Sequence, residues 1–182
     1  MNPLNTTVTS RLGRILLAVM ASGYLLIGSI SFAAEKTSSP TISNSPATIL
    51  VTGANRGIGL ALARTFHQHG LSVIATARKP NEALELKTIS VETLQLDITD
   101  PASIAALKSE LAGRPIDILI NNAGIKGHNT ANLEDLDIEQ LKTTFDVNSL
   151  GALRVIQALM PNLAIGSQKT VVNMSSRMGS IA

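Results

Sequence analysis

An apolar strand that runs into a glycine-rich turn and then into a helix is the feature that most restricts the fold. Residues 47–51 form an apolar run that predicts a buried strand. Gly53, Gly57 and Gly59 follow it at the spacing Gly-x-x-x-Gly-x-Gly. Residues 60–66 then place apolar side chains on one face of a helix. A strand, turn and helix of this kind direct backbone N–H groups at an anion such as a phosphate.

Strands and helices alternate from Pro46 onward, which predicts a three-layer α/β fold with a doubly wound parallel sheet, the Rossmann fold. Right-handed crossovers give the strand order 3-2-1-4-5, truncated after the fifth strand. The expected strands cover 47–52, 71–76, 92–96, 116–121 and 169–175. The expected helices cover 57–69, a short segment after Pro80, 101–112 and 136–160, and Pro161 stops the last of them. Asp100 and Pro101 are typical of an N-cap and first helical position.

The first 34 residues differ in composition from the rest. They contain no acidic residue, and Arg11 and Arg14 precede an uncharged run from Ile15 to Ala34. This pattern is typical of a secretory signal peptide, with cleavage after Ala33, although an uncleaved membrane anchor has the same features. Contact with a membrane through 15–34 follows from either interpretation, and the domain is expected on the far side of the membrane.

A polar Ser/Thr/Pro linker at 35–46 separates this segment from the predicted Rossmann domain at 47–182. The chain has 15 Lys and Arg against 13 Asp and Glu, so that removing Arg11 and Arg14 leaves 13 against 13. No basic patch therefore favours nucleic-acid binding. The absence of cysteine excludes disulfides and thiolate sites, and the three histidines form no predicted metal site.

Five strings arrive in one order. They are the glycine turn at 52–59, Asp97-Ile98 after a strand, Asn121-Asn122-Ala123-Gly124 ending a strand, Asn148 inside a long helix, and Asn173-Met174-Ser175-Ser176 ending another strand. Together they resemble the short-chain dehydrogenase/reductase family, and the Thr76-Ala77-Arg78 string resembles its carbonyl-reductase-like branch. The resemblance implies an oxidoreductase that transfers a hydride between a nicotinamide cofactor and a carbonyl or alcohol. Full-length members of the family are expected to be homo-oligomers.

The resemblance also implies a set of cofactor-binding residues. They are Gly53, Asn55, Arg56, Gly57, Ile58, Gly59, Arg78, Asp97, Ile98, Asn121, Asn122, Ala123 and Gly124. Ala77 stands where NAD-preferring members often carry Asp, and Arg78 follows it. Since arginine suits bidentate contact with a phosphate, Arg56 and Arg78 favour NADP(H) over NAD(H). By the same resemblance, Asp97 and Ile98 contact the adenine.

Two catalytic positions are carried over from the family. Ser176 resembles the serine that hydrogen-bonds the substrate carbonyl, and Asn148 resembles the asparagine that disturbs its helix and holds a water of the proton relay. The family's Tyr-x-x-x-Lys motif is not present, because the only tyrosine is Tyr24 and the last lysine is Lys169. We therefore expect this chain to be catalytically incomplete, and either a dinucleotide-binding module without turnover or a non-functional fragment is an alternative reading.

Two further expectations follow from the ends of the chain. The fifth strand should be an exposed edge that carries Val171, Val172 and Met174. An exported or membrane-anchored location conflicts with the cofactor, since NADP(H) is mainly a cytoplasmic resource and the segment has no twin-arginine pair.

Overall fold

A five-stranded parallel sheet forms the centre of the domain. The computed structural model describes residues 45–127 and 132–175. The sheet has the order β3-β2-β1-β4-β5, and every adjacent pair of its strands is parallel. The strands are β1 (Thr48–Val51), β2 (Ser72–Ala77), β3 (Glu92–Gln95), β4 (Ile118–Asn121) and β5 (Thr170–Asn173). This arrangement confirms the predicted fold class and strand order.

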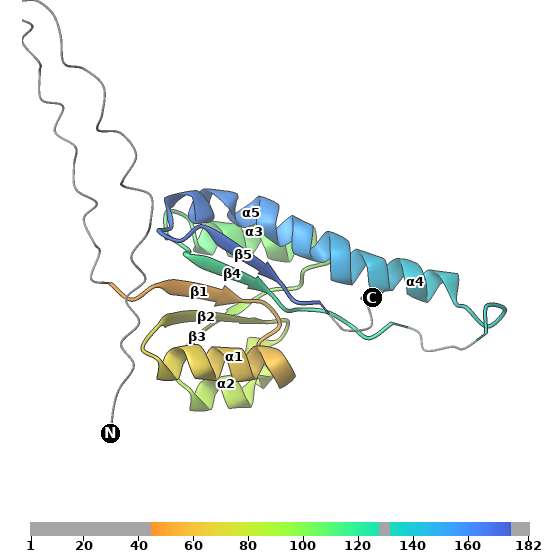
Figure 1. The fold of residues 1–182 in the computed structure, drawn as a ribbon, viewed down its shortest axis with the longest axis horizontal. Coiled ribbons are helices and arrows are strands. Elements are labelled where there is room, and N and C mark those ends of the chain that lie inside the picture. Colours follow the sequence, from red (N-terminus) through yellow and green to blue (C-terminus); the bar gives the residue numbers. More distant parts are fainter. Residues whose placement is uncertain (1–44, 128–131, 176–182) are drawn as a thin grey trace, which may run out of the picture. The chain divides into compact units, whose positions relative to one another are not determined.

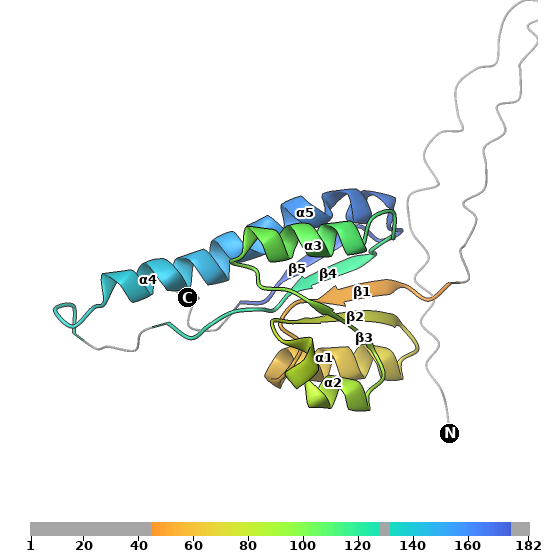
Figure 2. The same ribbon diagram turned by 180° about the vertical axis from the view of Figure 1, so that it is seen from behind.

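Helices cover both faces of the sheet. They are α1 (Gly57–Gln68), the 3₁₀ turn η1 (Pro80–Glu82), α2 (Leu84–Thr88), α3 (Pro101–Glu110), α4 (Ile138–Phe145), the π-helical turn η2 (Asp146–Gly151) and α5 (Ala152–Ile165). Figures 1 and 2 show α1 and α2 on one face and α3 and α5 on the other, while α4 continues the line of α5 beyond the sheet. The Asp100 carboxylate accepts a hydrogen bond from the Ala102 N–H at 2.9 Å, which confirms the expected N-cap of α3.

The alternation of side chains along the strands divides the core into two buried clusters, because successive strand residues point to opposite faces. Leu50, Ile74 and Leu119 pack with residues of α3 and α5. Ile49, Val73 and Ile120 pack with residues of α1 and α2. Both faces of the sheet are therefore buried, as the continuous apolar runs of the sequence predict.

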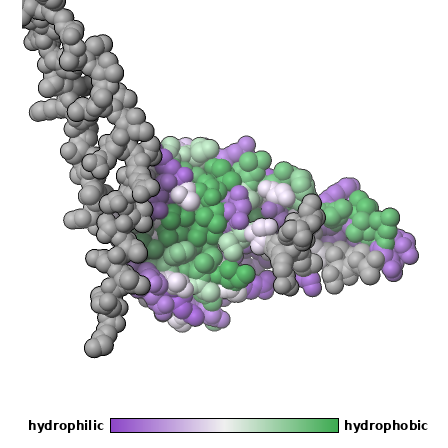
Figure 3. All heavy atoms as spheres, in the orientation of Figure 1, coloured by the Kyte–Doolittle hydropathy of each residue, from purple (hydrophilic) through white to green (hydrophobic). Residues whose placement is uncertain are grey.

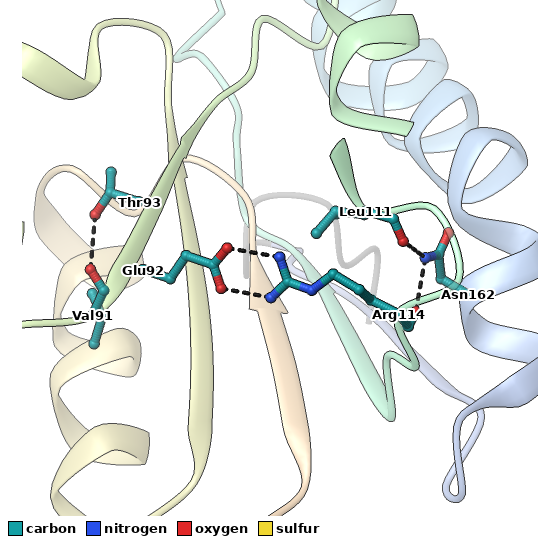
Figure 4. Close-up of polar contacts among 6 residues, drawn as sticks. All are labelled: Val91, Glu92, Thr93, Leu111, Arg114 and Asn162. Carbon is teal, nitrogen blue, oxygen red and sulfur yellow. Dashed lines mark hydrogen bonds and ion pairs between the residues drawn. The ribbon is translucent and has the colours of Figure 1, made fainter. Parts of the chain in front are cut away.

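The long helix continues past Pro161, so the prediction that this proline stops it is wrong. α5 runs to Ile165 with Pro161 inside it. The Asn162 side chain is buried and donates to the carbonyls of Leu111 and Arg114 (Figure 4). The Asn162 carbonyl accepts from the Ile116 N–H. These tertiary contacts hold the last turn of the helix and offset the hydrogen bond that proline removes.

A bidentate ion pair joins the beginning of β3 to the chain before β4. The Arg114 guanidinium contacts both carboxylate oxygens of Glu92, at 2.7 and 2.6 Å (Figure 4). The hydrogen bond from Arg114 is the main cause that lowers the pKa of Glu92 below its ordinary value. This pair and Asn162 lie at the amino-terminal ends of the strands, where their hydrogen bonds join neighbouring segments of the chain.

The exposed face of β5 agrees with the edge-strand expectation. Val171 and Val172 are 37% and 38% exposed, and Met174 is 42% exposed. Figure 3 shows hydrophobic residues gathered over this part of the sheet. In the sheet that the structure describes, β5 pairs only with β4.

Several predictions from the sequence lie outside the described residues. They are the signal peptide or anchor at 1–34, the linker up to residue 44, and Ser176. Among the helices formed by the described residues, none is long and apolar enough to cross a bilayer.

Asp117 is a buried carboxylate that joins the beginnings of three strands. It precedes β4, is 7% exposed, and accepts hydrogen bonds from the Thr48 N–H at 2.7 Å and from the Ser167 N–H and hydroxyl, both at 2.6 Å. Burial alone would raise the pKa of Asp117, but the hydrogen bonds from Ser167, Thr48 and Gln168 outweigh burial and lower it below the ordinary value.

Asp117→Asn is expected to lower the free energy of unfolding by about 2–4 kcal/mol at neutral pH, because the amide replaces an ionised acceptor and turns a donor toward an N–H. The carboxylate contributes its stability above its unfolded pKa of about 3.9. That contribution is lost as the pH falls through the lower folded pKa. The difference between variant and wild type should therefore shrink below about pH 4, as measured by urea unfolding across pH.

Glu139→Gln is the control, since Glu139 pairs with Lys142 on an exposed helix surface. It should change stability little at any pH. A difference for Asp117→Asn that stayed constant down to the acid transition would contradict the assigned role of the carboxylate.

Candidate functional site

The carboxyl ends of β1 and β4 are joined by the side chains of Thr52 and Asn122. The Thr52 hydroxyl is buried and accepts from the backbone N–H groups of Asn122 and Ala123, at 2.9 and 3.0 Å. The Asn122 amide donates to the carbonyls of Thr52 and Gly53, at 2.9 and 3.1 Å. The glycine turn and the Asn121–Gly124 string, which are 70 residues apart, therefore meet at one edge of the sheet, as the predicted strand order requires.

Glycine is needed at different positions of the turn for different structural reasons. Gly53 has φ +63°, and a Cβ there would lie 2.8 Å from the Ala123 Cα. A Cβ on Gly59 would collide with the Asn122 amide nitrogen and the Gly53 carbonyl. Gly57 has φ +58°, but a Cβ there would face open space. Gly53 and Gly59 therefore allow close packing of the turn and α1, whereas Gly57 is open toward solvent.

The N-terminus of α1 has no side-chain cap. Arg56 occupies the N-cap position in an extended conformation and makes no capping hydrogen bond, and the first turn contains no acidic residue. The first N–H groups of a helix have no partner within the helix and carry partial positive charge. This end of α1 is therefore suited to an anion.

The glycine turn is also bonded to the end of β2, where Arg78 follows. The Ala54 N–H donates to the Thr76 carbonyl at 2.8 Å. Arg56 and Arg78 each lie two residues beyond this hydrogen bond, and both are exposed. Ala77 lies between Thr76 and Arg78 and is 2% exposed, so the side chain at this position points into the core.

Asp97 and Ile98 follow β3 and take different positions. One carboxylate oxygen of Asp97 accepts from both the hydroxyl and the N–H of Thr99, and these bonds, together with the charge of Arg78, lower the pKa of Asp97 below its ordinary value despite partial burial. Ile98 is 6% exposed and packs against Gly151 of the π-turn. Asp97 remains available to a ligand, while the Ile98 side chain belongs to the core.

The π-helical turn η2 carries Asn148 against the loop after β4. The Asn148 amide accepts from the Ile125 N–H and donates to the Ile125 carbonyl, both at 2.9 Å. Gly124 leaves room for this contact, because a Cβ there would lie 3.0 Å from the Asn148 side-chain oxygen. The helix is thus disturbed at Asn148, and the Asn148 side chain positions the loop that contains Ile125.

An open groove of about 810 Å³ lies between this loop, α5 and the end of β5. Its lining residues come from the glycine turn, the Asn121–Gly124 string, the π-turn, α5 and the residues after β5. They include Ile58, Asn121, Asn122, Ala123, Gly124, Asn148 and Ser175. Ser175 leads directly to Ser176, which lies beyond the described residues. Asn55 is exposed in the turn.

Thr52 and Asn173 were not predicted as site residues. Asn173 accepts from the Asn121 side-chain amide at 2.9 Å across β4 and β5 and lines the groove. In both cases the available signal was a polar residue at the end of an apolar strand. Thr52 is also buried, and a buried polar side chain must find a partner.

Comparison with known proteins gives a consistent set of relatives. Residues 47–182 match the family described as short chain dehydrogenase. A short-chain dehydrogenase/reductase of Pestalotiopsis microspora is 42% identical over 117 residues, covering 64% of this chain and 42% of that protein. An NADPH-dependent 1-acyldihydroxyacetone phosphate reductase of Schizosaccharomyces pombe is 39% identical over 132 residues, covering 70% of this chain and 44% of that protein.

A solved carbonyl reductase from Pseudomonas aeruginosa in complex with NADP has a similar structure. It is 32% identical, with a TM-score of 0.65, and the match covers 74% of this chain and 63% of that chain. The chain spans about half the length of the curated relatives that it matches.

Gly59→Ala is expected to lower the free energy of unfolding by about 1–3 kcal/mol, since the added methyl group must displace the Asn122 side chain and the Gly53 carbonyl. In an Asn122→Ala background the cost should be smaller, because one of the two colliding groups is removed. Urea unfolding of both single variants and the double variant measures this coupling.

Gly113→Ala provides the control. Gly113 has φ +74° and a Cβ there meets nothing within 4 Å, so that its cost should add to that of Asn122→Ala. Additive costs for Gly59 and Asn122 would contradict the close contact between α1 and the loop after β4.

Proposed function

Because the chain belongs to the short-chain dehydrogenase/reductase family, we propose that its glycine turn and groove bind NADP(H) and a carbonyl or alcohol substrate for hydride transfer. The observation that carries this proposal is the uncapped N-terminus of α1, flanked by the exposed Arg56 and Arg78. Oxidoreductases of this family use a dinucleotide, and the preference for its phosphorylated form is the finer part of the proposal.

The pyrophosphate is proposed to bind at the N-terminus of α1. The helix offers backbone N–H groups and positive charge there. Gly57 leaves open space beside the turn, because no described atom outside its own stretch of backbone lies within 4 Å of where its Cβ would be. An anion can therefore approach the backbone closely. Asn121, Asn122, Ala123 and Gly124 would form the adjoining wall of the crevice beside the nicotinamide end.

The 2′-phosphate of NADP(H) is proposed to bind between Arg56 and Arg78. Three other arginines, Arg64, Arg114 and Arg154, form ion pairs with carboxylates. Arg56 and Arg78 form no ion pair among the described residues, although the charge of Arg78 acts on the nearby Asp97 carboxylate. Unpaired guanidinium groups suit a phosphate. The relatives named for NADPH or solved with NADP support the same preference.

The proposed chemistry depends on the groove. Bound NADPH supplies a hydride, and the residues of the chain bind and orient the reactants. Ser176 is proposed to donate a hydrogen bond to the substrate carbonyl, because the chain leads to it from Ser175 in the groove wall. Both polar atoms of the Asn148 side-chain amide are bonded to Ile125. We therefore propose that this side chain positions the loop, and a relay water would have to bind other atoms.

The alternative function is dinucleotide binding without turnover. Within these 182 residues no tyrosine follows Tyr24 and no lysine follows Lys169, so these residues alone lack the family's Tyr-x-x-x-Lys motif. Ser176 is no substitute for a general acid whose pKa is adjusted toward the working pH. Cofactor binding and turnover therefore need separate tests.

NADPH is expected to bind more tightly than NADH. Arg56→Ala and Arg78→Ala should each weaken NADPH binding about tenfold, which corresponds to the loss of ~1.4 kcal/mol from one charge-assisted contact. The affinity for NADH should stay unchanged. Titration of the nicotinamide fluorescence measures both affinities. Arg64→Ala on α1 is the matched control and should change neither.

Equal affinities of the wild type for the two cofactors would contradict the proposed phosphate contacts. Ala77→Asp, which would add a carboxylate near the ribose, is a weaker test. Since Ala77 is buried, the substitution also places a charge in the core and lowers stability.

The 182-residue chain is expected to show no NADPH oxidation above background with aldehydes and ketones, because it contains no tyrosine general acid beyond residue 24. The same chain extended by a Tyr-x-x-x-Lys segment should be active. Loss of the reduced-nicotinamide absorbance follows the reaction. Turnover by the 182-residue chain that Ser176→Ala abolishes would show that its catalytic acid lies elsewhere.

A further inference from the structure

Asp146 begins the π-turn and Arg154 follows it, and neither residue belongs to the proposed cofactor or substrate site. Asp146 is the first residue of η2, and Arg154 lies in the first turn of α5. The Arg154 guanidinium contacts the Asp146 carboxylate at 2.6 Å, with the two side chains 32% and 38% exposed. The second terminal nitrogen of Arg154 is buried and has no hydrogen-bond partner among the described residues.

The spacing of eight residues explains why this ion pair depends on the π-turn. At 3.6 residues per turn, residues seven apart lie about 20° apart around a helix axis, whereas residues eight apart lie about 80° apart. A π-turn closes its hydrogen bonds one residue later than an α-helix and so inserts one residue into the turn. Across η2, positions eight apart therefore take the place of positions seven apart and lie on one face.

The direction of the side chains also suits the contact. Long helical side chains point back toward the N-terminus of their helix. Arg154 follows Asp146 in the chain and reaches back across the turn to it. In an uninterrupted α-helix the same two side chains would be separated around the axis, so the ion pair favours the π-turn over the regular helix.

The π-turn determines two contacts near the groove. It places Asn148 against both backbone polar groups of Ile125. It also places Gly151 against Ile98, where a Cβ would lie 2.7 Å from the Ile98 side chain. Both Asn148 and Ile125 line the groove.

We propose that Asp146 and Arg154 are positioning residues that hold the π-turn and, through Asn148, the Ile125 wall of the groove. The use of this groove by a substrate rests on the proposed function, but the positioning itself does not. Removing Asp146 is the more severe change, because it leaves the Arg154 guanidinium partly buried without a partner.

Hydrogen exchange of the full chain, read by mass spectrometry without cofactor, tests this proposal. Arg154→Met should speed exchange in peptides that cover 146–151 and Ile125 by about fivefold, as expected for the loss of a partly exposed ion pair. Arg154→Lys should restore part of the protection. The exchanged pair Asp146→Arg with Arg154→Asp should restore more protection than either of its single substitutions.

Arg114→Met is the matched control. Its ion pair with Glu92 is equally short and similarly exposed, at 2.6 Å and 40% and 39%, but lies at the amino ends of the strands. It should lower global stability without a local effect at 146–151. If Arg154→Met does not fold, the local exchange rates of Arg154→Lys and of the exchanged pair are compared with those of the wild-type chain instead.

Exchange at 146–151 and Ile125 that stays at the wild-type rate in Arg154→Met would overturn the proposal. Equal effects of Arg154→Met and Arg114→Met on these peptides would also overturn it. Cofactor titration of the same samples separates the two proposals. A chain that binds no NADP(H) but shows the local exchange effect would contradict only the cofactor proposal. A chain that binds NADP(H) without the local exchange effect would contradict only the positioning proposal.

Discussion

The groove depends on the hydrogen bonds that the buried hydroxyl of Thr52 accepts. It accepts the N–H groups of Asn122 and Ala123 after β4 has ended, where these groups have no strand partner. The Asn122 side chain returns two hydrogen bonds to the carbonyls of Thr52 and Gly53. Since a buried donor without a partner costs about 1–3 kcal/mol, this reciprocal set keeps the ends of β1 and β4 together. The close approach of Gly59 to Asn122 then fixes α1 against the same point.

The two ends of the sheet differ in how completely their polar groups are satisfied. At the amino ends, Asp117, the Glu92–Arg114 pair and Asn162 tie together the strands and the ends of the helices. At the carboxyl ends, the N-terminus of α1 has no side-chain cap. The described side chains with a buried polar atom that lacks a partner, Thr76, Asn121 and Arg154, lie near this end as well. Groups left unsatisfied in an otherwise well-bonded domain are expected at a functional site.

Local patterns were sufficient for the elements and their order, but not for the contacts between distant residues. The glycine turn, the apolar runs and the Asp100-Pro101 start of α3 all depend on neighbouring residues and were predicted correctly. The continuation of α5 past Pro161 depends on Asn162 contacting Leu111 and Arg114, about 50 residues earlier, which no local pattern reveals. The burial of Ile98 under Gly151 and the ion pair across the π-turn likewise arise only when the fold is formed. Resemblance to a family indicated the disturbance at Asn148 but not its contact with Ile125.

The two walls of the groove are held with different strength. The sheet side rests on the Thr52 and Asn122 hydrogen bonds and on strands that are buried on both faces. On the helix side, α5 itself packs on the sheet. The contact between the π-turn and the Ile125 loop rests on two hydrogen bonds of Asn148, each worth about 1 kcal/mol, and on a partly exposed ion pair worth about 1 kcal/mol or less. Regions held by few contacts open at lower free energy than the core of a domain. We therefore expect a ligand in the groove to shift the Ile125 loop and the π-turn before it disturbs the glycine turn.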